Sequence, residues 1–513
     1  MIISLLLLSL ASVAPASPQQ PILTRNTGFE IHPLIFGVDA NGVDWGPELR
    51  TADHATVAIN SVGDIAVAYH TTRDDLGLPP LKQVEVALFQ YNVLNGNWTL
   101  VQRELLGSVI YNPLFSPTQQ MVKCERPDVI AVGDRFFVVW TRRYDRSFPN
   151  QAMEPAVLEC AWIRWNGSSF QVFNDASTVT YPDGLGLELD RNYHVRECAG
   201  VPDAVLLDAG DATHLPTVGV VYPHQTDFGD DPNSLPPNDG TRLSDLRLVT
   251  STIDSAGVIA KQNLAAPLIP GTVFDGPSNT GGDASAGLVL PDCAPATIPD
   301  LSANPRIYRF WLTYEEQFFP GATVPDGRIR LKFMEGPLAG PWTALATQTF
   351  GVMTNPFVRR RPNVSSYPAG APTMDVVSIG FNKTSSGSGD VIFEEWNWDE
   401  QFGLSKVLWP PGTGFVNDPG GVPVDDIRPI PLHGRTIPLV RRCYVDRNTV
   451  PCQIIAYDLA TNATTVKAFS LAGLGRPATS YRFNSVSGAD EFVLAWEQVH
   501  SPATYSRIWV QVE

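Results

Sequence analysis

The feature of this sequence that most restricts its fold is a pair of short strand-like segments that recurs along the chain. In one clear copy, residues 126–132 are mainly apolar, Gly133 and Asp134 form a turn, and residues 136–140 are apolar and end in Trp140. Runs rich in Val, Ile and aromatic residues, separated by a Gly-containing turn, are typical of two hairpin-connected strands. Similar pairs occur at residues 54–69, 201–222, 361–381 and 476–496, and two less regular copies end at Tyr314 and Tyr457.

These seven copies predict an all-β chain that folds as a single β-propeller of about seven four-stranded blades, with six to eight possible. A third strand of alternating polarity follows most pairs, for example at residues 84–91 and 157–165. Apolar inner strands and alternating outer strands fit radially packed sheets, because only the inner strands are buried on both faces. The last copy has three clear strands, and residues 29–36 could supply the fourth and close the ring. A pair of β-sandwiches would not explain seven copies of one strand pair.

The first residues of the chain have the pattern of an export signal. Residues 2–10 form an apolar run, and small residues follow at positions 14–16. This pattern predicts a signal peptide over residues 1–16, although no Lys or Arg precedes Arg25. Residues 17–513 would then form the propeller domain, secreted or periplasmic. The apolar run is too short to span a bilayer, so no membrane insertion is expected.

The charge balance restricts the partners of the chain. The sequence has 53 acidic and 36 basic residues, and its formal net charge is −17. Such an excess of negative charge argues against a nucleic-acid partner, because the phosphate backbone would be repelled. The partner we expect is instead a polysaccharide or an extracellular protein ligand, and we expect the chain to be a monomer.

The six cysteines permit disulfides in an exported chain. Cys443 and Cys452 flank a turn-forming stretch, and we expect a disulfide between them across one hairpin. No Cys-x-x-Cys pair exists, so the sequence does not predict a zinc site.

Candidate site residues follow from the repeat. In a propeller, the loops that join the blades and those between the second and third strands open on one face, around the central funnel, where ligands usually bind. Arg residues near this face could bind carboxylates or sulfates bidentately, or could instead tie adjacent blades together. The predicted substrate-binding residues are His54, Arg126, Arg143, Arg196, His224 and Arg361. His or Tyr beside Arg is suited to proton abstraction next to a carboxylate, and the predicted catalytic residues are His70, Tyr144, Tyr193 and His194.

At the level of architecture, the chain resembles the secreted propeller polysaccharide lyases and, more loosely, the sialidase-like propellers. The lyase resemblance rests on the repeat and on His, Tyr and Arg side chains grouped on one face: His70, Arg126, Arg143, Tyr144, Tyr193 and His194. It implies cleavage of uronate-containing polysaccharides by β-elimination. The sequence has no Ser-x-Asp-x-Gly-x-x-Trp box, which weakens the likeness to sialidases.

Two functions therefore remain open from the sequence. One is a secreted propeller that binds glycan or protein ligands at its funnel face without catalysis. The alternative is a polysaccharide lyase, which we favour over a glycoside hydrolase if the chain is an enzyme. No cofactor is expected, although the acidic stretch at residues 227–239 could hold a structural calcium ion through oxygen ligands.

Overall fold

The computed structural model of the chain is built from β-strands, with no helix among the residues that it describes. Within that part of the chain, no helix is long and apolar enough to cross a membrane. The described residues are 21–32, 51–73, 81–107, 121–145, 156–173, 187–192, 201–225, 244–264, 266–270, 273–274, 284–296, 302–318, 327–350, 358–368, 374–385, 388–406, 428–432, 439–446, 450–458, 463–485, 487–500 and 505–513. The predicted signal peptide and the acidic stretch at residues 227–239 lie outside them.

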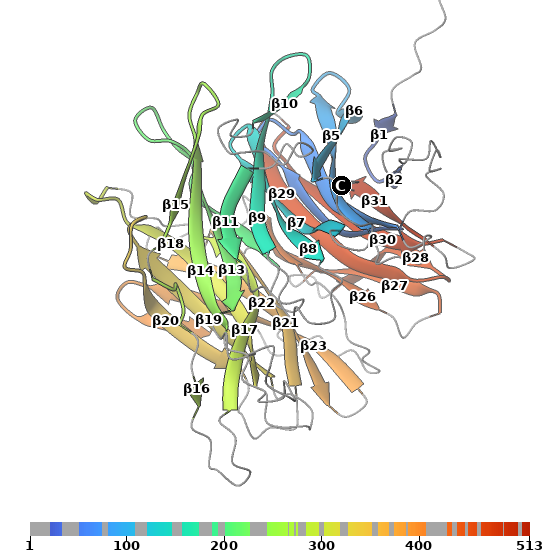
Figure 1. Cartoon of the computed structure of the whole chain (residues 1–513). Coiled ribbons are helices and arrows are strands. Elements are labelled where there is room, and N and C mark those ends of the chain that lie inside the picture. Colours follow the sequence, from blue (N-terminus) through green and yellow to red (C-terminus); the bar gives the residue numbers. More distant parts are fainter. Residues whose placement is uncertain are drawn as a thin grey trace, which may run out of the picture.

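The described strands form seven four-stranded units, which we call blades and number along the chain (Figure 1). Blade 1 contains β3 (Thr51–Ile59), β4 (Ile65–Arg73), β5 (Leu81–Asn92) and β6 (Asn97–Gly107), and blade 2 contains β7 (Met121–Val132), β8 (Arg135–Asp145), β9 (Ala156–Trp165) and β10 (Phe170–Phe173). Blade 3 contains β12 (Asp203–Asp208), β13 (Thr217–Gln225), β14 (Ser244–Ile253) and β15 (Ile259–Asn263), and blade 4 contains β17 (Ala284–Pro295), β18 (Tyr308–Phe318), β19 (Gly327–Gly336) and β20 (Thr343–Phe350). Blade 5 contains β21 (Val358–Pro368), β22 (Met374–Ser385), β23 (Ser388–Asp399) and β24 (Gly403–Lys406). Blade 6 contains β25 (Arg428–Leu432), β26 (Leu439–Asp446), β27 (Cys452–Asp458) and β28 (Ala463–Ser470), and blade 7 contains β29 (Leu474–Asn484), β30 (Ala489–Val499), β31 (Ser506–Val512) and β2 (Phe29–Ile31).

Three further short strands extend these sheets. β1 (Ile22–Leu23) pairs with β6, β11 (Leu187–Asn192) pairs with β9, and β16 (Val273–Phe274) pairs with β17. Blades 3 and 4 are joined into one sheet by a single parallel contact, in which Ser244 of β14 faces Gly287 of β17. The all-β propeller predicted from the repeat is therefore confirmed.

The N-terminal segment closes the ring. β2 supplies the outer strand of blade 7 by pairing antiparallel with β31, so that Phe29 faces Val510 and Ile31 faces Ile508 (Figure 1). This confirms the prediction that residues near Phe29 complete the last blade. β2 covers part of the edge of β31 and itself offers an edge of only 3 residues, and very short edge strands pair poorly with another chain.

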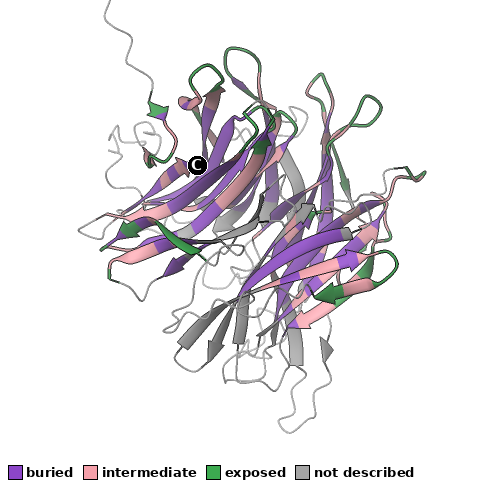
Figure 2. Cartoon of the chain, turned by 180° about the vertical axis from the view of Figure 1, so that it is seen from behind, coloured by how far each residue is buried: buried purple, intermediate pink, exposed green. Residues whose placement is uncertain are grey.

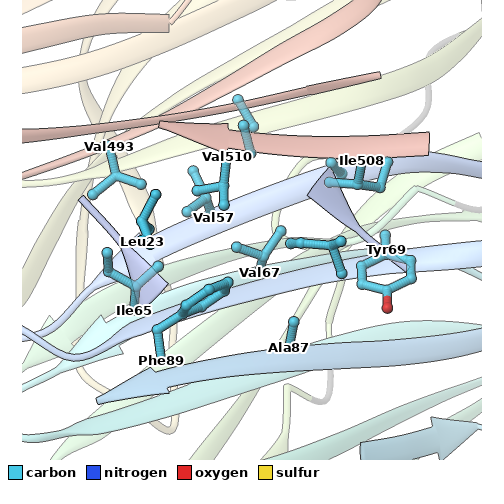
Figure 3. Packing of buried hydrophobic residues seen from close by; sticks show 14 of the residues in the cluster. Leu23, Val57, Ile65, Val67, Tyr69, Ala87, Phe89, Val493, Ile508 and Val510 are labelled. Carbon is cyan, nitrogen blue, oxygen red and sulfur yellow. The ribbon is translucent and has the colours of Figure 1, made fainter. Parts of the chain in front are cut away.

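The core is distributed between neighbouring blades. In the cluster between blades 1 and 7, Val57, Val67 and Phe89 pack against Val493 and Val510, and each side chain is at most 5% exposed (Figure 3). Burying such a side chain contributes about 1.5–3 kcal/mol. The inner strands β3 and β12 are buried along most of their length, whereas the outer strands β20 and β28 are largely exposed and exposed residues also gather at hairpin tips (Figure 2). The site described below is built on the ends of such inner strands.

A second set of contacts fastens the inner strands of blades 2 to 5. The Asp that follows the proline in three copies of the repeat accepts a hydrogen bond from a backbone N–H of the next inner strand. The pairs are Asp128 with Ala204 (2.9 Å), Asp203 with Cys293 (2.6 Å) and Asp292 with Val364 (2.9 Å). Each carboxylate is 5% exposed. We call these contacts the aspartate links. They join consecutive blades, because each donor lies one blade further along the ring.

The predicted disulfide between Cys443 and Cys452 is wrong, because both residues are thiols in the structure. Cys443 of β26 faces Ala456 of β27, and Asp446 faces Gln453. Cys452 therefore lies about four residues along the hairpin from the position opposite Cys443, which is about 13 Å. A disulfide requires Cα atoms about 4.4–6.8 Å apart. The two residues do belong to the neighbouring strands β26 and β27, but the register of these strands separates them.

Candidate functional site on the funnel face

One face of the ring gathers the ends of the strands that carry most of the predicted site residues. In each blade the inner strand begins on this face and the second strand returns to it, because the two form an antiparallel hairpin. We call it the funnel face. The hairpin turns at residues 60–64 and 133–134 lie on the opposite face.

Each of five inner strands is bulged near the funnel face. In blade 1, Asp53 pairs with His70 and Thr56 with Ala68, so the inner strand holds one residue more than its partner. Equivalent shifts occur in blades 2, 4, 5 and 7. Such bulges redirect side chains, and they are common beside functional sites.

Three of the bulged residues have a backbone conformation that side chains other than glycine rarely adopt. The φ angles are 56° at His54, 56° at Arg126 and 50° at Leu290. A non-glycine residue with this geometry costs about 1–3 kcal/mol, and such residues concentrate at ligand-binding and active sites. His54 and Arg126 are half-buried and stand at the funnel ends of neighbouring inner strands. The predicted substrate-binding residues His54 and Arg126 thus occupy equivalent, strained positions in blades 1 and 2.

His70 connects these two positions. Its Nε2 contacts Oδ1 of Asp53, and its Nδ1 accepts a hydrogen bond of 3.3 Å from the backbone N–H of Arg126. Because Nδ1 accepts this bond, the ring proton lies on Nε2 and is directed to the carboxylate of Asp53. The side chain of His70 is buried, and its ring stacks on that of His54 with centroids 5.7 Å apart. His70 therefore holds two inner strands in place, and both of its nitrogens are engaged by the protein.

Charged groups extend the network to the neighbouring blades. Oε1 of Glu497, at the end of β30 in blade 7, accepts a hydrogen bond from the backbone N–H of His54. On the other side, Nζ of Lys82 in blade 1 donates to Oε2 of Glu125 in blade 2 at 2.7 Å. The contacts run continuously from blade 7 to blade 2. We call this set of residues the funnel cluster: Asp53, His54, His70, Lys82, Glu125, Arg126 and Glu497.

A buried tyrosine lies next to the funnel cluster in the sequence of β4. The hydroxyl of Tyr69 donates to Oε2 of Glu85 at 3.0 Å, and both side chains are fully buried. Burial, together with the negative charge of Glu85 and this hydrogen bond, raises the pKa of Tyr69 well above its usual value. The hydroxyl therefore stays protonated and acts as a structural donor.

His224 lies in a separate cluster on blade 3. Its Nδ1 is 3.4 Å from Oδ1 of Asp245, which is buried, and Nε of Arg247 is also 3.4 Å from that oxygen. The predicted His224 is thus on the funnel face but is not one of the residues gathered in blades 7, 1 and 2.

The other predicted residues are placed only in part. Arg143 and Tyr144 belong to β8 and Arg361 to β21, and their side chains are outside the described part of the chain. Tyr193, His194 and Arg196 lie wholly outside it. Sequence reasoning missed Asp53, Lys82 and Glu125. Asp53 could have been found, because it directly precedes His54 at the start of a repeat copy.

The funnel cluster is made of charged and polar side chains. It contains the carboxylate of Asp53, the imidazole of His70 and the residue Arg126 at the ends of neighbouring strands. Among the described residues, no group of three or more His, Cys, Asp or Glu side chains could hold a metal ion.

Comparison with known proteins gives matches only at the level of solved structures. No protein-family model matches the chain, and no curated protein matches it. An α-L-arabinanase from Penicillium chrysogenum in complex with arabinobiose is similar at 10% identity and a TM-score of 0.37, over 95% of this chain and 98% of the other. The NanB sialidase of Streptococcus pneumoniae matches at 10% identity and a TM-score of 0.39, over 94% and 70% of the two chains. A sialidase from Trypanosoma rangeli matches at 10% identity and a TM-score of 0.35, over 96% and 60%. The description of this chain as a propeller follows from its own strand pairing.

Proposed function

We propose that this protein is a secreted propeller that binds a glycan at its funnel face, in the sector where blades 7, 1 and 2 meet. The observation that carries the proposal is the pair of strained, half-buried residues His54 and Arg126 at the funnel ends of adjacent inner strands. Strain of this kind persists only where the surrounding structure enforces it, and here His70 and Glu497 hold both backbone segments.

The composition of the funnel cluster favours a ligand rich in hydroxyl groups. Each sugar hydroxyl both donates and accepts, so it is matched by neighbouring carboxylate, imidazole and guanidinium groups. The groups stand on strands rather than on loops, which keeps their geometry fixed before the ligand arrives.

The second candidate function from the sequence is cleavage of uronate polymers by β-elimination. This reaction requires a general base whose proton-accepting atom faces the substrate. His70 does not offer such an atom, since Nδ1 and Nε2 are both engaged within the protein. We therefore favour binding over catalysis for the sector that contains His70.

The test is a glycan array probed with the mature chain and with the double variant His54→Asn and Arg126→Asn. Asn is chosen because it tolerates a positive φ, so that the change removes the side-chain chemistry without adding backbone strain. We expect saturable binding of a glycan by the wild type, at least tenfold weaker binding by the double variant, and the same melting temperature within about 2 °C.

Two results would contradict the proposal. One is glycan binding that the double variant retains in full, which would place the ligand elsewhere. The other is a rise in absorbance near 235 nm when the chain is incubated with uronate polysaccharides, because unsaturated sugar ends would establish a lyase. His224→Asn is the matched control, since it changes a histidine on the same face outside the funnel cluster.

A further inference from the structure

Two hairpin turns on the face opposite the funnel face contain an asparagine followed by a glycine. Asn95–Gly96 lies between β5 and β6 in blade 1, and Asn166–Gly167 lies between β9 and β10 in blade 2 (Figure 1). Both asparagines are exposed. A third such pair, Asn41–Gly42, lies outside the described part of the chain. An asparagine in this position can react with its own backbone, because glycine has no side chain to block the approach of its nitrogen.

The reaction is the formation of an intramolecular imide. The backbone nitrogen of the glycine loses its proton to water or hydroxide and forms a bond to Cγ of the asparagine. The bond from Cγ to Nδ2 then breaks, and the amide nitrogen leaves as ammonia after taking up a proton from water. Water next opens the five-membered imide at either carbonyl, which gives aspartate or isoaspartate. The rate depends on whether the glycine nitrogen is available and on whether the negative charge that develops on Oδ1 is stabilised.

At Asn166 the turn supplies three hydrogen-bond donors to Oδ1. The backbone N–H groups of Ser168 and Ser169 each donate at 2.9 Å, and Oγ of Ser168 donates at 3.0 Å. Fixed donors stabilise an oxygen that becomes negative in the transition state. Within the described part of the chain, the backbone N–H of Gly167 makes no hydrogen bond. A Cβ atom built at Gly167 would meet no atom within 4 Å, so the turn is also open to the water that the reaction needs.

The turn of blade 1 has neither of these hydrogen-bond features. In the described structure, Oδ1 of Asn95 accepts one hydrogen bond, from the backbone N–H of Asn97 at 3.0 Å. The backbone N–H of Gly96 donates to the carbonyl oxygen of Asn92 at 2.9 Å, and attack by this nitrogen would break that bond. The two turns therefore share the reactive dipeptide and its exposure, and they differ in the hydrogen bonds around it.

The turn of blade 2 is held in its geometry by its neighbours. The backbone N–H of Asn166 donates to the carbonyl oxygen of Ser169 at 3.0 Å, and the rings of Trp165 and Phe170 pack edge to face with centroids 5.0 Å apart. The side-chain amide of Gln102 in blade 1 bonds both backbone groups of Phe170, each at 2.9 Å. An ordered turn keeps the reacting atoms close together, which favours intramolecular attack.

We propose that Asn166 is a site of spontaneous modification, at which the folded chain converts asparagine to isoaspartate and aspartate faster than at Asn95. The product replaces a neutral amide by a carboxylate, and isoaspartate lengthens the backbone by one carbon atom. The proposal goes beyond glycan binding, because the turn lies on the face opposite the funnel cluster. Freshly prepared and modified chains should therefore bind a glycan equally well.

The test follows both turns in one sample of the mature chain during incubation in mildly alkaline buffer. Peptide mass spectrometry measures the conversion of amide to acid, and enzymatic methylation detects isoaspartate. We expect Asn166 to react roughly tenfold faster than Asn95, because the loss of a donor to a developing oxyanion slows a reaction by at least that factor. In urea at a concentration that unfolds the chain, the two asparagines should react at similar rates, since the hydrogen bonds that distinguish them are lost.

Two variants examine the role of the donors. Ser168→Ala removes one donor from Oδ1 of Asn166 and should slow the reaction there severalfold in the folded chain but not in urea. Ser487→Ala is the matched control, since it removes an exposed serine hydroxyl from a turn of blade 7 on the same face, and it should leave both rates unchanged. Equal rates at Asn166 and Asn95 in the folded chain, or a preference for Asn166 that persists in urea, would overturn the proposal. So would an unchanged rate in folded Ser168→Ala.

Discussion

Removing the central aspartate link should measurably weaken the ring. Asp203 is 5% exposed, and its Oδ2 accepts the backbone N–H of Cys293 at 2.6 Å, joining blades 3 and 4. A hydrogen bond to a charged group contributes about 1.5–3 kcal/mol, and Asp203→Ala leaves the N–H of Cys293 without this acceptor. A domain of about 490 residues unfolds with an entropy of about 1 kcal/mol/K. We therefore expect Asp203→Ala to lower the melting temperature by about 1.5–3 °C.

The assay is differential scanning calorimetry at a fixed scan rate, because the melting temperature of a chain that unfolds irreversibly depends on the scan rate. Asp203→Asn keeps an oxygen acceptor without the charge and should lower the melting temperature by about half as much. Asp134→Ala is the control, since its carboxylate is 60% exposed and makes only a long contact of 3.7 Å to Arg135. Equal melting temperatures for Asp203→Ala and Asp134→Ala would refute the structural role assigned to the aspartate links.

Further predictions concern the ring closure and the thiols. Burial would raise the pKa of Glu491, but hydrogen bonds from Asn484 and Arg482 and the charges of Arg482 and Arg25 bring it below its usual value. A carboxyl group whose pKa is lower in the folded state stabilises the fold when the pH is above its unfolded-state pKa, which is about 4.3 for glutamate. This stabilisation is lost as the pH falls through the folded-state pKa. The melting temperature of Glu491→Gln should thus be below that of the wild type at pH 7, and the difference should shrink below about pH 5; a constant difference would contradict this. Because Cys443 and Cys452 are thiols, reduction of a bond between them should not contribute to any change in melting temperature on adding a reductant. Mass spectrometry after denaturation in iodoacetamide should find both residues alkylated. A disulfide between them would contradict the strand register.

The fold was largely predictable because each blade repeats the same local pattern. The run from Val129 to Trp140 forms β7 and β8 as expected, and Phe29 lies in the strand that closes blade 7. These features depend on apolar periodicity, which is visible in a single sequence. The failed disulfide at Cys443 and Cys452 depends on register, which a hairpin turn alone does not determine.

The site was predictable only in part. His54 and Arg126 were found because they begin two copies of the repeat. Their positive φ angles could not be foreseen, because glycine or asparagine usually marks that conformation. The structural role of His70 depends on contacts with Asp53 and with the backbone of Arg126, which lies 56 residues away. A contact of that range leaves no local signal in the sequence.

The most direct test of the proposed binding site is hydrogen–deuterium exchange of the wild type with and without the glycan identified on the array. Our account predicts slower exchange in peptides that cover residues 51–57 and 121–128, at the funnel ends of β3 and β7. Slower exchange confined to the hairpin turns at residues 60–64 and 133–134, on the opposite face, would contradict it.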